Sequence, residues 1–201
     1  MKSELEKIAA GELYRVNDEL NALMAQSRQI CKEYNETNEN ETEKRKAILQ
    51  KLLGTCPENI TILPDMHFDY GSHTHIGDNF FANYGMIVLD VGKVTIGRDV
   101  MFGPRVSLFA AGHPTDVEVR RELLEYGYSI TIGDDVWIGG NTVVNPGVTI
   151  GSGTVIGSGS VVTKDIPAGV VAAGNPCRVI RVLDEKDREY WHAQRRVWQE
   201  S

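Results

Sequence analysis

Residues 130–162 read ITIGDDVWIGGNTVVNPGVTIGSGTVIGSGSVV, and an aliphatic residue recurs at every sixth position of this stretch. This first column consists of Ile132, Ile138, Val144, Ile150, Ile156 and Val162. Glycine directly follows four of its members. A second column precedes the first by two residues and consists of Ile130, Val136, Thr142, Val148, Thr154 and Ser160. Both columns keep one strict period of six.

A period of six excludes an α-helix, because at 3.6 residues per turn the apolar residues would spiral around the helix surface. A series of hairpins would show polar turns at longer spacing. The period instead fits a hexapeptide-repeat β-helix, in which each repeat makes one short strand and one corner. Three repeats close a triangular coil of about 18 residues, with the aliphatic columns pointing into a stacked core. The recurring glycine suits a tight corner, where a residue without Cβ tolerates positive φ.

The same period extends towards the N-terminus. Ile96, Phe102 and Leu108 are in phase with the first column. A further series is offset by two residues and consists of Ile76, Ala82, Val88 and Val94. Residues 60–180 then supply between about six and seven coils, a prism on the order of 30 Å long. The sequence therefore predicts a parallel β-helix whose two ends need caps.

Helical patterns on both sides of the repeat supply candidates for these caps. Apolar residues at spacings of three and four between Leu20 and Tyr34 predict one helix. A second helix is predicted to begin near Asn40, with Glu43 placed as in a capping box. Aromatic residues recur at roughly helical spacing after Asp184. We expect an N-terminal helical region at 1–58, a β-helix at 59–183 and a C-terminal helical tail at 184–201.

The composition limits the classes of function. The chain has 201 residues, of which 41% are hydrophobic and 24% charged, as in a globular protein. A net charge of −7 argues against a nucleic-acid binder, which needs a basic face. We find neither a signal-peptide core nor an apolar stretch long enough for a membrane span. The three cysteines lack metal-type spacing, so we expect reduced thiols in a cytoplasmic protein without membrane contact.

The repeat is interrupted once, between Leu108 and Ile130, by a loop that begins FAAGHPTD at residues 109–116. Loops of this length in a compact repeat domain are usually functional or disordered. This loop, at about 109–130, carries several charged side chains and a histidine, His113, close to the rigid wall. Pro114 restricts the backbone of that histidine to extended conformations. His113 is therefore the foremost candidate for a functional residue.

Four stretches together resemble the maltose and galactoside O-acetyltransferase family. They are DYGSHTHIGDNFFAN (69–83), FAAGHPTD (109–116), VWIGGNTVVNPGVTIG (136–151) and GSVVTKDIPAGVVAAGNPCRVIR (159–181). The similarity extends to AAGELY at residues 9–14 and so covers nearly the whole chain. The resemblance implies a left-handed parallel β-helix. It also implies a homotrimer in which acetyl-CoA and the acceptor meet in clefts between neighbouring subunits.

The resemblance and the chemistry of acetyl transfer together assign roles to five residues. A sugar hydroxyl is a poor nucleophile while it keeps its proton, and a histidine can take that proton near neutral pH. Our hypothesis is that His113 is this base and that the acetyl group passes directly to the acceptor. By family analogy, a backbone N–H near Gly140 stabilises the oxyanion. By resemblance, Asp69 and Asn83 line the acceptor pocket, and Asp90 is a further candidate from the same wall.

The resemblance also marks residues for coenzyme A. Its pantetheine arm would lie along exposed strand backbone near Ser158 and Thr163. The basic residues Lys164, Arg178 and Arg181 are candidate phosphate partners at one end of an otherwise acidic protein. Trp137 directly precedes an inward aliphatic residue, so its side chain is expected to face outward, at a subunit interface or a cofactor cleft.

Three other interpretations are weighed: a metal site, a different acceptor and a non-catalytic scaffold. His73 and His75 lie on one face of a predicted strand, but we find no third histidine placed as a metal site would need, so we expect no metal. The acceptor is expected to be a sugar or glycoside such as maltose, glucose or a galactoside. It is alternatively another small hydroxylated compound such as an antibiotic. A non-catalytic trimeric scaffold is the third reading, although packing requires neither His113 nor Asn83.

Overall fold

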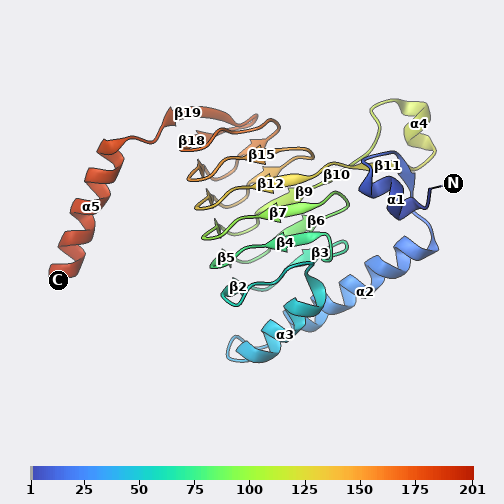
Figure 1. Ribbon diagram of the computed structural model, residues 1–201, viewed down its shortest axis with the longest axis horizontal. Coiled ribbons are helices and arrows are strands. Elements are labelled where there is room, and N and C mark those ends of the chain that lie inside the picture. Colours follow the sequence, from blue (N-terminus) through green and yellow to red (C-terminus); the bar gives the residue numbers. More distant parts are fainter. Residues whose placement is uncertain (1) are drawn as a thin grey trace.

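The computed structural model describes residues 2–201 and contains a triangular prism of parallel strands (Figure 1). We name two of its three sheets for their outward residues and the third for the long loop that leaves it. The threonine face consists of β4 (Thr74–Ile76), β7 (Val94–Ile96), β12 (Ile130–Ile132) and β15 (Thr149–Ile150). The loop face consists of β3 (His67–Phe68), β6 (Ile87–Leu89), β9 (Ser107–Phe109), β14 (Val143–Val144) and β17 (Val161–Val162). These short strands belong to successive coils, as the period of six predicts.

The third sheet, which we name the tryptophan face, runs the full length of the prism. It consists of β2 (Ile60–Ile62), β5 (Phe80–Ala82), β8 (Met101–Phe102), β13 (Trp137–Ile138), β16 (Val155–Ile156), β18 (Val170–Ala173) and β19 (Arg178–Val182). Strand β19 runs antiparallel to β18 and ends the sheet. Trp137 is 51% exposed and faces outward, which confirms the expectation from its position before Ile138.

The predicted columns form the core of the prism. Ile132 pairs in register with Ile96 and Ile150, and Ile138 pairs with Phe102 and Ile156. Every member of the first column is at most 1% exposed. The threonines and serine of the second column are fully buried as well, and Thr142 donates its hydroxyl hydrogen bond to the Gly139 carbonyl at 2.7 Å. The single period thus stacks one continuous apolar core and satisfies its polar members.

The glycine that follows the aliphatic column has a different role from the predicted one. Gly133 and Gly139 do not have positive φ, whereas Asp135 and Asn141, two residues further on, do. A Cβ on Gly139 would come within 2.5 Å of the Ser158 nitrogen in the next coil, and one on Gly133 within 2.6 Å of the Ser152 nitrogen. Glycine is needed at these positions because the backbones of adjacent coils approach closely there.

The N-terminal residues form α1 (Glu4–Ala9), β1 (Tyr14–Arg15), α2 (Asp18–Asn35) and α3 (Thr42–Leu52). Helices α2 and α3 cover the first coils of the prism (Figure 1). Asn17 caps α2, because its side chain accepts a hydrogen bond from the Leu20 nitrogen. The predicted capping box of the next helix was wrong. Helix α3 begins at Thr42, and its N-cap residue, Glu41, makes no capping bond with its side chain.

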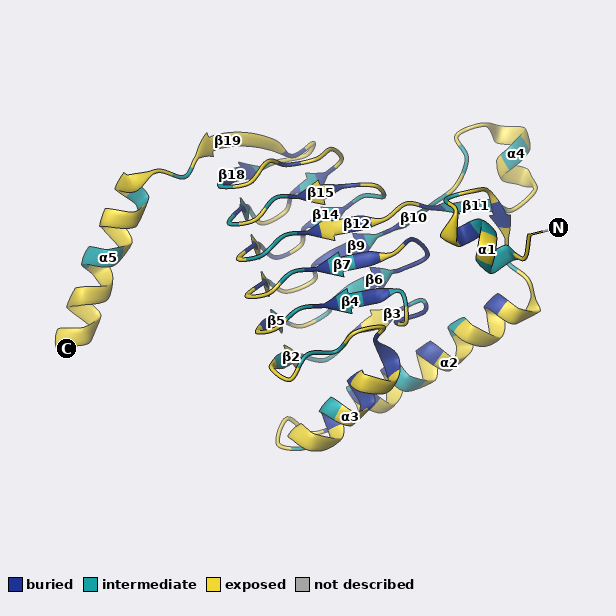
Figure 2. Ribbon diagram, in the orientation of Figure 1, coloured by how far each residue is buried: buried dark blue, intermediate teal, exposed yellow. Residues whose placement is uncertain are grey.

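The long loop folds into β10 (Ala111–Gly112), α4 (Val117–Arg121) and β11 (Leu124–Gly127). Strand β11 lies between β10 and β1, so the loop and the N-terminal segment share a small antiparallel sheet beside the prism (Figure 1). At the opposite end, α5 (Glu185–Glu200) stands away from the prism and has no buried residue (Figure 2). None of the helices formed by residues 2–201 is long and apolar enough to cross a membrane.

Candidate functional site

His113 lies at the base of the loop, immediately after β10. Its Nδ1 is 3.2 Å from the carbonyl oxygen of Leu124, on the opposite arm of the loop. A carbonyl only accepts, so this contact places the proton on Nδ1 and leaves the Nε2 lone pair available. The side chain is exposed. His113 therefore has an oriented imidazole ring with a free basic nitrogen.

The register of the small sheet places an acid beside this histidine. Ala111 pairs with Gly127 and Gly112 with Tyr126, so the next opposing position to His113 is Glu125. Glu125 is half-buried and pairs on its other side with Tyr14, whose hydroxyl donates to Glu125 Oε2 at 2.6 Å. Tyr14 and Glu125 thus form a cross-strand pair, and the register places His113, just past the end of β10, opposite Glu125.

Asp69 follows β3, directly past the end of the loop face, and its side chain is half-buried. Burial raises the pKa of the Asp69 carboxyl, and the neighbouring carboxylates of Asp90 and Glu125 add to this effect while Arg28 opposes it, which brings the pKa to about 6. Asp69 also lines a groove of about 570 Å³ between α2 and the loop face. Desolvated carboxylates beside a groove are suited to bind hydroxyl groups.

This environment predicts a dependence of stability on pH. The folded protein holds the Asp69 proton up to a pH of about 6, whereas the unfolded chain releases it near the ordinary pKa of 3.8. The favourable contribution of Asp69 to folding is therefore complete below about pH 4 and is lost as the pH rises through about 6. Asp69→Asn is expected to raise the urea midpoint of unfolding clearly at pH 8 and much less at pH 4. An equal shift at both pH values would contradict this assignment.

Asp90 occupies a structural position instead of the predicted acceptor-facing one. Its side chain is fully buried. Oδ1 accepts a hydrogen bond from the Tyr70 nitrogen at 2.8 Å, and Oδ2 accepts one from the Thr74 hydroxyl at 2.9 Å. Because both oxygens are used inside the protein, Asp90 holds the turn that follows Asp69 and presents no free carboxylate to a ligand.

A second group of predicted residues lies at the opposite corner of the loop face. Asn83 follows β5, Gly140 follows β13 and Ser158 follows β16, all where the tryptophan face turns into the loop face. Asn83 donates its backbone N–H to the Phe102 carbonyl, and its side-chain oxygen accepts from the Tyr84 nitrogen. Gly140 is buried, and a Cβ there would come within 2.9 Å of the Pro104 carbonyl oxygen, so the corner is closely packed.

The corner that holds Asn83 and Gly140 is separated from the side of Asp69 by the width of the loop face. Six residues lie between Asn83 and Asp90, which corresponds to roughly 20 Å of extended chain. Thr163 and Lys164 follow β17 on the side of Asp69, and both are exposed. Within one chain, His113 and Glu125 lie on facing arms of the loop and Asp69 lies within electrostatic reach of Glu125, whereas Asn83 and Gly140 lie at the other corner of the loop face.

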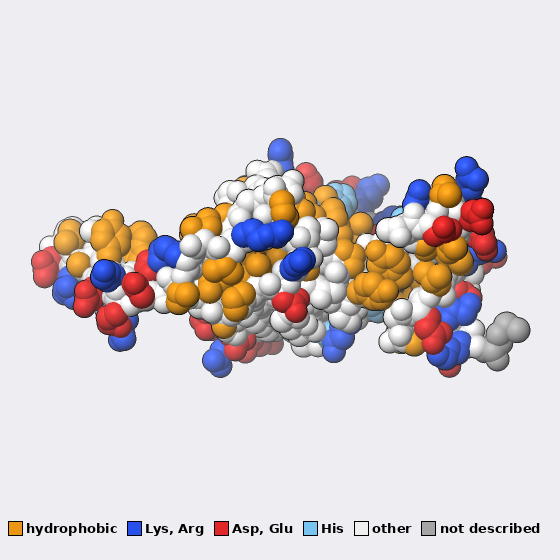
Figure 3. Space-filling model, turned by 90° about the horizontal axis from the view of Figure 1, so that it is seen from above, with side chains coloured by type: hydrophobic (Ala, Val, Ile, Leu, Met, Phe, Trp, Pro, Cys, Tyr) orange, Lys and Arg blue, Asp and Glu red, His pale blue; other side chains and the backbone are white. Residues whose placement is uncertain are grey.

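The predicted phosphate partners on β19 lie at the C-terminal end of the prism. Figure 3 views the molecule from that end and shows basic side chains among hydrophobic ones. Arg178 is exposed and donates to the Cys177 carbonyl at 2.8 Å. Arg181 forms a two-point ion pair with Asp187 of α5, at 2.6 and 2.7 Å. A phosphate at Arg181 would therefore share or replace this ion pair.

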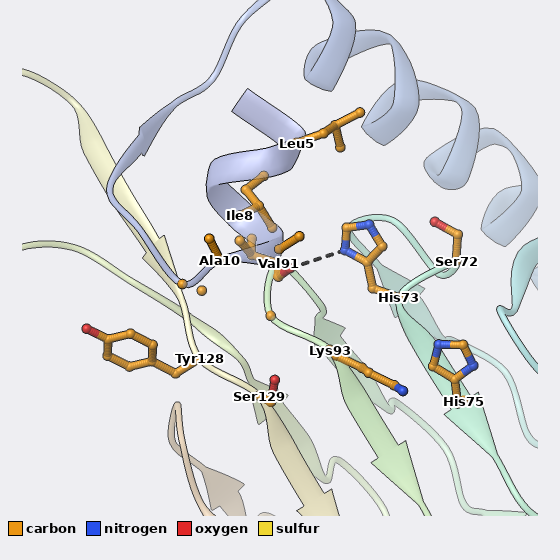
Figure 4. A pocket seen from close by; sticks show the side chains of 14 residues that line it. Leu5, Ile8, Ala10, Ser72, His73, His75, Val91, Lys93, Tyr128 and Ser129 are labelled. Carbon is orange, nitrogen blue, oxygen red and sulfur yellow. Dashed lines mark hydrogen bonds between the residues drawn. The ribbon is translucent and has the colours of Figure 1, made fainter. Parts of the chain in front are cut away.

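His73 and His75 lie beside a separate cavity of about 460 Å³ between α1 and the threonine face (Figure 4). The His73 ring stacks on Tyr70 at 4.8 Å, and its Nδ1 is 2.8 Å from the Asp90 carbonyl oxygen. His75 Nδ1 is 2.9 Å from the Thr55 hydroxyl. Within residues 2–201, no group of three or more His, Cys, Asp or Glu side chains is arranged to hold a metal ion.

Sequence reasoning missed Tyr14, Arg28 and Glu125. Tyr14 and Arg28 belong to the N-terminal segment, for which the sequence pattern predicts only a helical cap. Glu125 is one of several acids in the loop. The spacing of the repeat contains no information on them because none belongs to a coil. Only the pairing of β1 with β11 brings Tyr14 and Glu125 together.

Comparison with known proteins places this arrangement in a family. The family described as "Maltose acetyltransferase hexapeptide capping motif" matches residues 7–57, and "Bacterial transferase hexapeptide (six repeats)" matches residues 129–164. A putative acetyltransferase of Saccharomyces cerevisiae is 48% identical over 91% of this chain and 94% of its own length. The galactoside O-acetyltransferase of Escherichia coli is 43% identical, over 92% of each chain.

Two solved structures agree with these matches. A maltose O-acetyltransferase from Clostridium difficile 630 superposes with a TM-score of 0.89 at 44% identity, over 91% of this chain and 98% of the other. A galactoside acetyltransferase in complex with coenzyme A gives a TM-score of 0.90 at 43% identity, over 94% of each chain. In each of these comparisons, identity above 40% covers more than nine tenths of this chain. The chain therefore belongs to the maltose and galactoside O-acetyltransferase family of hexapeptide-repeat acetyltransferases.

Proposed function

We propose that this protein is an acetyl-CoA-dependent O-acetyltransferase that acetylates a hydroxyl group of a sugar or glycoside. The observation that carries the proposal is the arrangement on the small sheet: an imidazole with its Nδ1 on the Leu124 carbonyl stands beside Glu125, near Asp69. A free basic nitrogen flanked by carboxylates fits an acceptor that presents several hydroxyl groups, because carboxylates accept hydrogen bonds from them.

In this mechanism, acetyl-CoA supplies the acetyl group as a thioester. Nε2 of His113 takes the proton of the acceptor hydroxyl, whose oxygen then attacks the thioester carbonyl carbon. The Leu124 carbonyl holds the ring through Nδ1 and favours the imidazolium that results. The backbone N–H of Gly140 is the proposed donor for the charge that develops on the carbonyl oxygen. His113 finally returns the proton to the departing thiolate, so no residue is acetylated.

The residues present fit a coenzyme A molecule along the prism. Ser158 and Thr163 are exposed at the two corners of the loop face, where strand backbone is accessible to the pantetheine amides. Lys164, Arg178 and Arg181 are exposed cations near the C-terminal end and are suited to the phosphates. Gly140 and Asn83 lie in earlier coils on the same corner as Ser158. We therefore propose that the thioester end lies towards Gly140 and the phosphates lie towards β19.

We further propose that the protein works as a homotrimer with its sites between subunits. Two faces of the prism carry outward apolar columns, and the third carries threonines. The tryptophan face presents Phe81, Met101, Trp137, Val155 and Val171, and the loop face presents Ile87, Leu89, Phe109, Val143 and Val161. Two apolar faces suit a ring in which each prism contacts two neighbours. Helix α5, with Trp191 and Trp198 exposed by 65% and 75%, provides further apolar surface for a neighbour.

The separation of His113 from Asn83 within one chain allows a direct test of the proposed trimer. His113→Ala and Asn83→Ala are each expected to abolish most activity in pure form. Unfolded and refolded together in equal amounts, they are expected to recover about one quarter of the wild-type activity, because one interface in four then combines two intact halves. Each variant refolded alone gives the background activity, and the wild type refolded alone gives the refolding yield. No recovery in the mixture would show that both residues serve the same site from one subunit.

The acceptor is identified by measuring thiol release from acetyl-CoA in the presence of a panel of sugars, glycosides and hydroxylated antibiotics. We expect release that depends on maltose, glucose, a galactoside or a related sugar. Release with an antibiotic alone would place the acceptor in the other class of small hydroxyl compounds. A complete lack of acceptor-dependent release across the panel would favour a trimeric scaffold without catalytic activity.

A further inference from the structure

Tyr14 is a nearly fully buried residue of the N-terminal strand β1, with 1% of its surface exposed. Its hydroxyl donates to Glu125 Oε2 at 2.6 Å, although the two residues are 111 positions apart in the chain. They oppose each other in the pairing of β1 with β11. The hydrogen bond thus joins the N-terminal segment to the loop that carries His113.

Packing alone does not require a hydroxyl at this position. The ring of Tyr14 belongs to a small core with Ile8, Leu20, Tyr70 and Val91, which a phenylalanine would fill equally well. A buried hydroxyl has to find a partner, because an unpaired one costs free energy. The carboxylate of Glu125 provides that partner, and burial followed by this contact raises the pKa of Tyr14 far above its usual range. Tyr14 therefore stays protonated and acts as a donor.

The partner of Tyr14 is itself part of the acceptor site described above. Glu125 opposes the position of His113 across the small sheet and lies close enough to Asp69 to raise the pKa of that carboxyl. Its neighbour in β11, Leu124, supplies the carbonyl that holds His113 Nδ1. Tyr14 fixes one Glu125 oxygen, Oε2, and within residues 2–201 no hydrogen bond is made to the other oxygen. Movement of β11 would therefore disturb Glu125 and His113 together.

We propose that Tyr14 is a positioning residue for acetyl transfer and that Glu125, which it holds, binds the acceptor. The N-terminal strand then completes the acceptor site in addition to capping the prism. Arg15 supports the same strand pair from outside, through an exposed ion pair with Glu122 at 3.7 Å. Exposed ion pairs of this kind contribute little to stability. The partly buried hydrogen bond between Tyr14 and Glu125 is therefore the main side-chain link between β1 and β11. This inference rests on the proposed function.

The test begins with Tyr14→Phe, which removes the hydroxyl and keeps the ring. Loss of a hydrogen bond to a charged group changes an equilibrium constant or a rate constant by about 10- to 100-fold. We expect kcat/KM for the acceptor to fall by about tenfold or more, while KM for acetyl-CoA stays unchanged. The matched control is Tyr128→Phe, because Tyr128 lies in the same loop base with its side chain exposed. That variant is expected to retain wild-type kinetics.

A double-mutant cycle distinguishes positioning from a general loss of stability. Glu125→Ala removes the carboxylate that accepts the Tyr14 hydrogen bond. If Tyr14 acts through Glu125, the double variant Tyr14→Phe with Glu125→Ala loses little more acceptor kcat/KM than Glu125→Ala alone. Additive losses, or an equal loss in KM for acetyl-CoA, would overturn the proposal.

A second measurement does not depend on activity. Long-range ¹⁵N–¹H spectra of selectively labelled histidine report which ring nitrogen carries the proton. We expect the Nδ1–H form of His113 in the wild type and a mixture of tautomers in Tyr14→Phe. An unchanged tautomer in that variant, together with unchanged acceptor kinetics, would refute the positioning role. A wild-type protein inactive with every acceptor would refute the proposed function instead, and the spectra would still decide the role of Tyr14.

Discussion

Replacement of His113 by alanine is expected to lower turnover by about a hundredfold or more, because a positioned general base contributes about that much to a proton transfer. The ring is exposed and makes one hydrogen bond, to the Leu124 carbonyl, so its loss leaves the core intact. We expect the variant to stay folded and to keep the oligomeric state of the wild type, with KM for acetyl-CoA close to that of the wild type. The measurement is the steady-state rate of thiol release at saturating acetyl-CoA and acceptor.

The control is His192→Ala. His192 lies on α5, which Figure 1 shows at the opposite end of the molecule from the long loop. Its removal is expected to leave turnover unchanged. Unaltered turnover in His113→Ala would refute the assignment of the base. A change of oligomeric state in that variant would indicate instead that His113 supports an interface between subunits.

The second large effect is one of stability. Asp90→Ala is expected to lower the free energy of unfolding by about 3 kcal/mol, because it leaves buried donors without an acceptor. The Tyr70 nitrogen and the Thr74 hydroxyl, at 2.8 and 2.9 Å from its two oxygens, lose their partner. Urea unfolding of both proteins at one fixed concentration gives the difference. Asp90→Asn, which keeps one acceptor oxygen, is expected to lie between the alanine variant and the wild type.

The matched control for Asp90 is Asp65→Ala, since Asp65 is an exposed aspartate of the preceding coil. It is expected to change the free energy of unfolding by about 0.5 kcal/mol or less. If Asp90→Ala left stability unchanged but raised KM for the acceptor, Asp90 would contact the acceptor after all. The structural role assigned to its carboxylate would then be wrong.

The prism could be predicted from sequence because each coil repeats the same environment. A residue such as Ile138 must fill the same place in the stack as Phe102 and Ile156, so the period appears directly in the sequence. The outward position of Trp137 followed from the same alternation. The repeating glycines were recognised, but their reason was not: close approach of coils and positive φ both favour glycine, and only coordinates separate the two.

The proposed acceptor site is harder to predict because it depends on contacts between distant segments. The prediction of His113 rests on its place in the interruption of the repeat. The sequence could not reveal that Glu125 stands beside it, because this follows from the register of β10, β11 and β1. Nor could it show that Asp90 turns inward while Asp69 stays half-buried. Acidic residues of one wall look alike in sequence, and burial decides which of them is free to bind.

The activity that we propose for this protein is transfer of an acetyl group from acetyl-CoA to a sugar hydroxyl with His113 as the base. The most direct measurement follows thiol release and the mass of the product with a responsive sugar, for the wild type and His113→Ala in parallel. We predict one thiol released for each O-acetylated sugar formed by the wild type, and a rate about a hundredfold or more lower in the variant. Equal rates for the two proteins, or thiol release without an acetylated sugar, would contradict the account.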